Sequence, residues 1–178
     1  MGHVLIPHPD TPCAAVSGIE AEVSRPRPGV LAVRSRVSGA TESLVMPPAI
    51  TGRTDGLWRH TCFEAFVRPT LGEAYRELNL AAGQWAAYRF DGYRLGMADA
   101  DVGPPDNHLA GEGGGAFACA AIWTLDLPDD RAWRIGVAAV IEETGGRLSY
   151  WALAHPPGKP DFHHADCFAL QVPPPDRT

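Results

Sequence analysis

The sequence has 178 residues and a formal net charge of −6, and this length is enough for one domain with a substantial core. Its apolar share of 45% is that of an ordinary globular protein, and no stretch approaches the ~18 continuous apolar residues of a membrane span. An acidic chain without a basic run is a poor partner for nucleic acid or an anionic membrane surface. The 19 glycines and 17 prolines favour short strands joined by turns.

The N-terminal stretch MGHVLIPHPDTPCAAVSG has no basic n-region and is interrupted by three prolines. We therefore expect no secretory signal and a cytoplasmic location, where the cysteines would be reduced thiols. The cysteines contain no CxxC pair, which argues against a structural zinc site. They are Cys13, Cys62, Cys119 and Cys167.

Nine segments have the alternation, β-branched content or apolar character of strands, and turn residues separate them. Residues 96–116 are glycine-rich and are predicted to form a long loop, whose GEGGGA motif precedes no helix, so no nucleotide cofactor is expected. Residues 71–82 have an alternative helical propensity. The spacing predicts an all-β, antiparallel β-sandwich of the jelly-roll or immunoglobulin-like kind, with about 8–10 strands and little helix. The predicted strands are 15–26, 29–39, 57–69, 74–81, 85–94, 117–127, 133–143, 147–154 and 167–172.

Two neighbouring predicted strands place hydrogen-bonding residues on one face, because side chains alternate along a strand. The face predicted to pack on the core carries Leu57, Phe63, Ala65, Val67, Leu78 and Leu80. If the two strands form a hairpin, the opposite face presents an exposed patch that Trp85, at the start of the next strand, extends. This patch consists of Trp58, His60, Glu64, Tyr75, Glu77 and Asn79.

The composition of this patch suits a polyhydroxylated ligand. Aromatic rings stack on the C–H faces of a sugar, while carboxylates and amides bind its hydroxyl groups. The alternative is that Trp58 and Tyr75 lie under a covering loop and that the polar groups satisfy one another.

Three motifs follow one another in the chain: GLWRHTCFEAFVRP, YRELNLAAGQWAAYRF and YWALAHPPGKPDFHHADCFAL. In this order they resemble a DOMON-like domain of bacterial proteins, a group related to family 9 carbohydrate-binding modules, over residues 15–173. The resemblance implies a β-sandwich that binds a ligand, classically a sugar or a haem, and performs no catalysis. It makes Trp58, Trp85, Glu77 and Asn79 plausible counterparts of sugar-binding residues. Met46 or Met97 could ligate a haem only by assumption, and no haem is expected.

The segment YWALAHPPGKPDFHHADCFAL, residues 150–170, gathers three histidines, two aspartates, a lysine and a cysteine. Adjacent His163 and His164 point to opposite sides of an extended chain, so one metal shell rarely uses both. Cys167 begins an apolar strand and is expected to be buried rather than nucleophilic. Three prolines favour a rigid structural loop. Its residues His155, Lys159 and Asp161 are candidates for lining a ligand site, and the roles of His163 and His164 stay open.

We therefore expect residues 1–178 to form a single domain, with its core over 15–173, that binds a small carbohydrate-like ligand without a catalytic residue, metal or cofactor. Two alternatives remain: a metal-assisted hydrolase built on residues 155–167, and a protein-interaction module whose partner the sequence does not identify. The expected ligand-binding residues are Trp58, His60, Glu64, Tyr75, Glu77, Asn79, Trp85, His155, Lys159 and Asp161.

Overall fold

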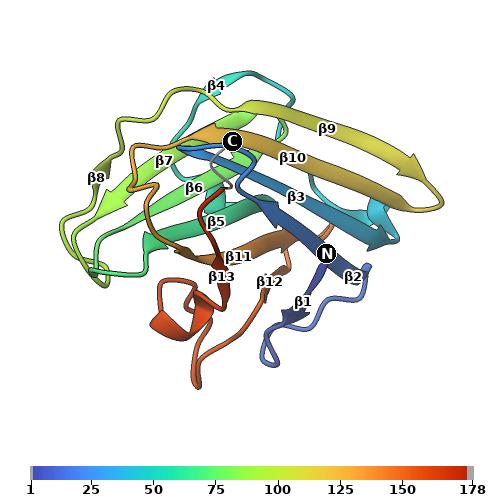
Figure 1. Ribbon diagram of the computed structural model, residues 1–178. Helices are drawn as coiled ribbons and strands as arrows, with labels where there is room; N and C mark the ends of the chain where they lie inside the picture. Colours follow the sequence, from blue (N-terminus) through green and yellow to red (C-terminus); the bar gives the residue numbers. More distant parts are fainter. Residues whose placement is uncertain (1, 176–178) are drawn as a thin grey trace.

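The computed structural model describes residues 2–175, which fold into two layers of β-strands (Figure 1). Helical structure in this range is limited to three 3-10 turns, η1 (Thr41–Ser43), η2 (Leu57–Arg59) and η3 (Ala165–Cys167), and none of them could cross a bilayer. The predicted all-β class is confirmed. The strands are β1 (His3–Pro7), β2 (Val16–Ser24), β3 (Val30–Gly39), β4 (Gly52–Arg53), β5 (Cys62–Pro69), β6 (Tyr75–Ala81), β7 (Gln84–Phe90), β8 (Ala98–Asp99), β9 (Asp106–Gly113), β10 (Ala116–Thr124), β11 (Trp133–Glu142), β12 (Leu148–Ala152) and β13 (Leu170–Val172).

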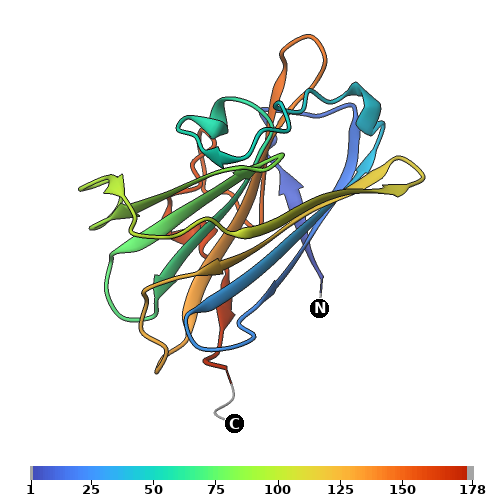
Figure 2. The same ribbon diagram turned by 90° about the horizontal axis from the view of Figure 1, so that it is seen from above.

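The strands form two sheets that face each other (Figure 2). The first sheet has the order β4-β7-β6-β5-β11-β12, with β13 beside β11 and β8 beside β7. The second sheet has the order β1-β2-β3-β10-β9. Strand β1 pairs with both β12 and β2, so hydrogen bonding continues from one sheet into the other. Within residues 2–175 the pairings are antiparallel except for β4 with β7, as expected of an antiparallel sandwich.

Large apolar side chains from both sheets fill the space between the layers. Leu5, Ile19 and Leu31 from the second sheet meet Trp133 and Ile135 from the first, and each is at most 1% exposed. Burial of this kind is the main stabilising contribution to a folded domain. Most of the predicted core face lies here, which confirms the alternation for Phe63, Ala65, Val67, Leu78 and Leu80.

The outer face of the first sheet is buried as well. Phe66 on β5 packs against Phe162 and Phe168 of the C-terminal segment, which we define as residues 153–169 between β12 and β13. Gly136 on β11 allows the segment to approach closely, because an added Cβ would lie 2.8 Å from the carbonyl oxygen of Cys167. The sandwich therefore has a second apolar cluster outside its two sheets.

Several predicted boundaries were wrong. Strand β5 begins at Cys62 rather than at residue 57, because Gly56 adopts a left-handed conformation (φ 78°) and the chain turns through η2. Leu57 consequently lies in the outer cluster instead of between the sheets. The stretch predicted as a loop over 96–116 contains β8 and β9, and β9 pairs along its length with β10 although its side chains are mostly exposed.

Three further expectations from the sequence concern strands β1 and β6. Strand β1 precedes residue 15, so the sandwich begins before the expected core of 15–173. The alternative helix over 71–82 is wrong, because Tyr75–Ala81 pairs with strands on both sides. Asn79 was expected at the surface, yet it is 0% exposed, and its amide donates a hydrogen bond to Oε1 of Glu77 at 2.9 Å.

Replacing Leu78 or Asn79 by alanine should destabilise the protein for two different reasons. Leu78→Ala leaves a cavity between the sheets, which should lower the free energy of unfolding by roughly 2–5 kcal/mol. Asn79→Ala removes a buried donor to Glu77, at a cost of about 1–3 kcal/mol. Urea unfolding of both variants measures these changes. An Asn79→Ala variant within ~0.5 kcal/mol of the parent would place Asn79 at the surface.

Candidate functional site

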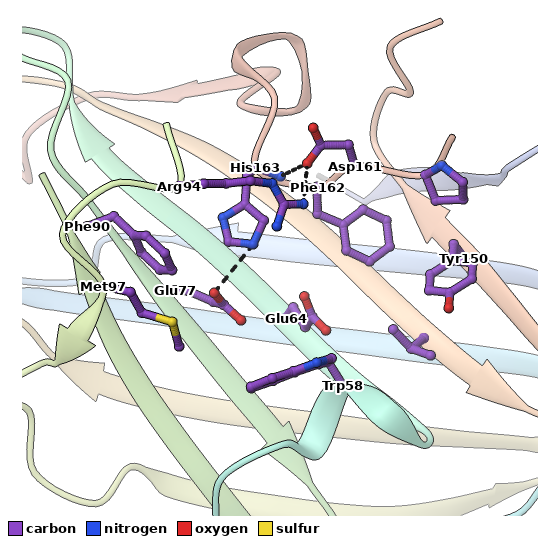
Figure 3. Close-up of a pocket in the computed structure, with 12 residues that line it drawn as sticks. Trp58, Glu64, Glu77, Phe90, Arg94, Met97, Tyr150, Asp161, Phe162 and His163 are labelled. Atoms are coloured by element: carbon purple, nitrogen blue, oxygen red, sulfur yellow. Dashed lines mark hydrogen bonds and ion pairs between the residues drawn. The ribbon is translucent and has the colours of Figure 1, made fainter. Parts of the chain in front are cut away.

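A cavity of about 340 Å³ lies on the outer face of the first sheet (Figure 3). Strands β5 and β6 supply its floor, and η2, the loop of residues 91–97 after β7, β12 and the C-terminal segment supply its walls. Its lining combines aromatic rings with charged groups from segments that are distant in the sequence. The lining residues are Trp58, Glu64, Glu77, Phe90, Arg94, Met97, Val140, Tyr150, Pro160, Asp161, Phe162 and His163.

Two carboxyl groups occupy the floor of this cavity. Glu64 on β5 lies opposite Asn79 on β6, and Glu77 lies opposite Phe66. The two glutamates are therefore diagonal neighbours on one face of an antiparallel pair, within reach of one another. Glu64 is 4% exposed and Glu77 is 5% exposed.

Burial controls the charge of both glutamates. It raises the pKa of Glu64 well above its ordinary value, and the charge of Glu77 raises it further. Burial also raises the pKa of Glu77, although the hydrogen bond from Asn79 and the charge of Arg94 oppose the shift. Oε1 of Glu64 has no hydrogen-bond partner among the residues that the structure describes. The floor is therefore rich in hydrogen-bond acceptors.

His163 forms one wall and is electrically neutral near neutral pH. Its burial lowers its pKa to about 4, and the charge of Arg94 acts in the same direction. Nδ1 lies 2.8 Å from the hydroxyl group of Tyr75, which itself accepts a hydrogen bond from the backbone N–H of Arg94. This arrangement favours donation from the tyrosine to Nδ1 and places the imidazole proton on Nε2. Nε2 is 3.7 Å from Oε2 of Glu77.

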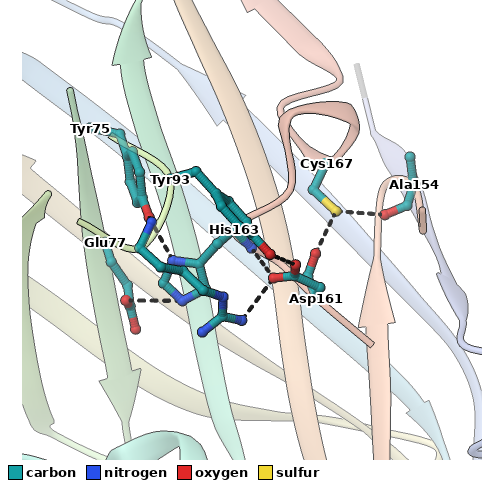
Figure 4. Close-up of polar contacts among 8 residues, drawn as sticks. Tyr75, Glu77, Tyr93, Ala154, Asp161, His163 and Cys167 are labelled. Carbon is teal, nitrogen blue, oxygen red and sulfur yellow. Dashed lines mark hydrogen bonds and ion pairs between the residues drawn. The ribbon is translucent and has the colours of Figure 1, made fainter. Parts of the chain in front are cut away.

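Asp161 joins the two segments that border the cavity (Figure 4). Its carboxylate accepts hydrogen bonds from the side chains of Tyr93 at 2.6 Å and Arg94 at 2.8 Å, and from the backbone N–H of His163 at 3.1 Å. Burial alone would raise the pKa of Asp161, but the hydrogen bonds from Tyr93 and Arg94 outweigh it and lower the pKa. We call this set of contacts the Asp161 clasp.

Aromatic rings form much of the remaining wall. Trp58 in η2 is half-buried and packs edge-on against Tyr88, with ring centroids 5.8 Å apart. Phe90, Tyr150 and Phe162 contribute further ring surface. The cavity thus offers stacking surfaces above a floor of hydrogen-bonding groups, which is the composition of a site for a small polar ligand.

The structure brings together four of the residues predicted for the ligand site. Trp58, Glu64, Glu77 and Asp161 line the cavity. Tyr75 lies behind His163 and lines an adjoining cavity of about 280 Å³ that shares His163 with the first.

The other predicted site residues lie elsewhere. His60 is exposed and its Nδ1 is 2.7 Å from Oε2 of Glu142, while Lys159 is exposed and does not line the cavity. Asn79 is fully buried on the same sheet face, beside Glu64 and Glu77, and does not line the cavity. The prediction that Trp85 extends the patch was wrong: it pairs with Leu80 and packs against Trp123 between the sheets.

The three histidines of the C-terminal segment have three different partners. His155 Nε2 lies 2.8 Å from the carbonyl oxygen of Ile6, and His163 contacts Tyr75. His164 Nδ1 accepts from the backbone N–H of Asp166 at the start of η3. Within residues 2–175, no three His, Cys, Asp or Glu side chains form a group suited to a metal ion. His155 and His163 therefore attach the segment to β1 and β6, while His164 caps η3 within the segment.

Sequence reasoning missed much of the cavity wall. Arg94 and Met97 lie in the stretch DGYRLGM, whose Asp91-Gly92 pair signals a turn but not what the turn encloses. Arg94 adopts a left-handed backbone conformation (φ 55°), which the sequence does not announce for an arginine. Tyr150 and Phe162 look like ordinary core residues until the C-terminal segment is placed.

Comparison with known proteins finds no matching family model and no matching curated protein. Solved structures do match. A "putative carbohydrate-binding protein" from Bacteroides uniformis matches with a TM-score of 0.67 and 14% identity, over 97% of this chain and 85% of that chain. A family 9 carbohydrate-binding module from Caldicellulosiruptor kristjanssonii, in complex with cellotriose, matches with a TM-score of 0.63 and 10% identity, over 100% and 84%.

A family 9 module from the same organism, in complex with glucose, matches with a TM-score of 0.56 and 11% identity, over 94% of this chain and 81% of that chain. At these identities the similarity establishes the fold alone. The chain has the β-sandwich fold of these proteins.

Glu64→Gln should stabilise the protein increasingly as the pH rises. The folded pKa of Glu64 lies well above 4.5, so its contribution to stability is present below about pH 4.5 and is lost as the unfolded chain ionises at higher pH. Each unit of this shift is worth about 1.4 kcal/mol, and glutamine avoids the loss. Melting temperatures of parent and variant should diverge between pH 5 and pH 8. A constant difference would mean that Glu64 ionises normally in the folded protein.

Asp161→Ala should release the Asp161 clasp without unfolding the sandwich. Amide hydrogen exchange over residues 91–97 and 160–164 should accelerate by about tenfold or more, since the lost charge-assisted bonds are worth at least ~1.4 kcal/mol. The control is Asp166→Ala, because Asp166 is exposed in the same segment. Equal exchange in the two variants would show that the clasp does not hold the cavity wall.

Proposed function

We propose that this protein binds a carbohydrate in the cavity on the outer face of the first sheet, without chemically altering it. The observation that carries the proposal is a partly enclosed cavity in which aromatic rings stand above a floor of two buried carboxyl groups. Trp58 would stack on the C–H face of a sugar ring, and Glu64 and Glu77 would bind its hydroxyl groups.

The size of the cavity supports a small ligand. Its volume of about 340 Å³ is near the lower end of the range for ligand pockets, roughly 300–1,000 Å³. The solved structures of the same fold include one in complex with glucose and one in complex with cellotriose, which supports a sugar as the ligand here. The proposal includes two narrower points: that the chain is a DOMON-like domain and that it is located in the cytoplasm.

The charge of the floor favours binding over glycoside hydrolysis. A hydrolase of the usual kind needs one ionised carboxylate beside one protonated carboxylic acid. Burial shifts the pKa of Glu64 and that of Glu77 in the same direction, whereas such a hydrolase has environments that push the two pKa values apart. We therefore propose no catalytic residue.

Tryptophan fluorescence during a titration with simple sugars tests the proposal. Of the five tryptophans, all of them in the described range, Trp58 alone lines the cavity. A hexose or its disaccharide should shift the emission of the parent protein saturably. Trp58→Ala should abolish this shift and weaken binding measured by calorimetry roughly two- to tenfold, since a stacked aromatic contact is worth ~0.5–1.5 kcal/mol.

His60→Ala is the matched control. His60 is close to Trp58 in the sequence but faces Glu142 at the surface, so this variant should bind as the parent does. Failure of all hexoses and their disaccharides to bind, or equal binding by Trp58→Ala and the parent, would contradict the proposal.

A further inference from the structure

We propose that the cavity selects sugars that carry a protonated amine, with the ammonium group seated between Glu64 and Glu77. This inference rests on the proposed function, since it specifies which class of sugar the same cavity prefers. Three independent features of the cavity lead to it: an imbalance of charge, an unpartnered buried oxygen and the aromatic walls.

The cavity contains more acidic than basic groups. Its lining includes three carboxyl groups, one guanidinium and one imidazole. The guanidinium of Arg94 is bound to Asp161 at 2.8 Å, so these two charges compensate each other. His163 is neutral, with a pKa lowered to about 4 chiefly by burial. Glu64 and Glu77 are therefore left without a cation of their own among the residues that line the cavity.

One carboxyl oxygen of the floor also lacks a hydrogen-bond donor. Glu64 is about nineteen-twentieths buried (4% exposed), and its Oε1 has no hydrogen-bond partner within residues 2–175. A buried polar atom without a partner is costly, and it is normally satisfied by a water molecule, an ion or a ligand. In the view of Figure 3, Glu64 lies between Glu77 on one side and Tyr150 on the other. A donor delivered at this point would serve both glutamates.

An ammonium group compensates for both the missing cation and the missing hydrogen-bond donor better than a hydroxyl group does. It supplies three donors and a full positive charge, whereas a hydroxyl supplies one donor and no charge. Charge-assisted hydrogen bonds are about twice as strong as neutral ones. The rings of Trp58, Phe90, Tyr150 and Phe162 add favourable contacts for a cation in a site shielded from water.

Binding of an ammonium group should also change the protonation of the floor. A bound cation favours the ionised form of a carboxyl group, so the complex should release protons near neutral pH. The other ionisable groups that face Glu64 and Glu77, or act on them electrostatically, come from every bordering element: Cys62, Tyr75, Arg94, Tyr150, Asp161 and His163. Burial raises the pKa of Tyr75 and of Cys62, so both stay neutral at this pH, and Arg94 and Asp161 stay paired.

The test compares amino sugars with their neutral parents by calorimetry at pH 7. The probes are glucose, galactose and mannose, the three corresponding 2-amino sugars, and the three N-acetylated forms, in which the amine can no longer carry charge. In each pair that binds, the amino sugar should bind roughly tenfold tighter or more, as expected for one charge-assisted hydrogen bond. The N-acetylated form should bind no tighter than the neutral parent. The heat of binding should depend on the ionisation enthalpy of the buffer for the amino sugars alone.

Glu64→Gln and Glu77→Gln should each reduce the preference for the amine while the protein stays folded. Glu112→Gln is the matched control, because it removes one negative charge from β9, where the carboxylate pairs with Arg34 and Arg36 outside the cavity. Its preference should equal that of the parent.

The outcomes separate this inference from the proposed function. Neutral hexoses that bind as tightly as the amino sugars would overturn the inference and leave carbohydrate binding standing. Equal loss of preference in Glu112→Gln and Glu64→Gln would also overturn it, because the effect would then come from the overall charge. No binding of any of the nine sugars would overturn the inference, and failure of the disaccharides to bind as well would overturn both.

Discussion

The exclusion of water from two carboxyl groups is the constraint on which the outer face of the first sheet depends. Glu64 and Glu77 lie on a sheet face that an ordinary sandwich would expose to solvent, yet both are almost completely buried. A buried carboxyl group must be neutral, hydrogen-bonded or paired with a cation. Asn79 meets this need for one oxygen of Glu77, and Glu64 keeps an oxygen without a partner. A ligand that donates a hydrogen bond to this oxygen would offset the free-energy cost of burying it.

The rest of the fold maintains that exclusion. The inter-sheet core holds β5 and β6 rigidly from one side, and the outer cluster seals the same strands from the other. Gly136 lets the C-terminal segment lie directly against β11, and the Asp161 clasp joins that segment to the loop of residues 91–97. Each contact is local, but together they convert a flat sheet face into a cavity.

The sequence predicted the layers better than the site. Alternation along β5 and β6 correctly separated Phe63 and Leu78 from Glu64 and Glu77, because a strand has a period of two residues wherever it occurs. The same argument failed for Leu57, where the chain is a 3-10 turn and the period no longer applies.

Side-chain exposure could not be inferred from alternation alone. The face that carries Asn79 was identified, but whether water reaches that face depends on η2, which contacts β6, and on the C-terminal segment, which is some 80 residues away in the sequence. Trp85 was assigned to the wrong face because the register of β7 against β6 is set by the turn at Ala82 and Gly83, both of which have positive φ. Arg94 was missed for a related reason, since a loop conformation decides where its side chain points.

The ionisation of Glu64 tests the proposed floor of the cavity most directly. A carbon-13 NMR titration of the side-chain carboxyl groups, with the Glu64 resonance assigned by its absence in Glu64→Gln, follows this group separately from the other carboxyls. The Glu64 resonance should stay at its protonated position well above pH 4.5 and move toward the ionised position when a bound amino sugar is present. A Glu64 resonance that titrates near its ordinary value and does not respond to sugar would show instead that water reaches the floor of the cavity and that the floor does not bind the amino sugar.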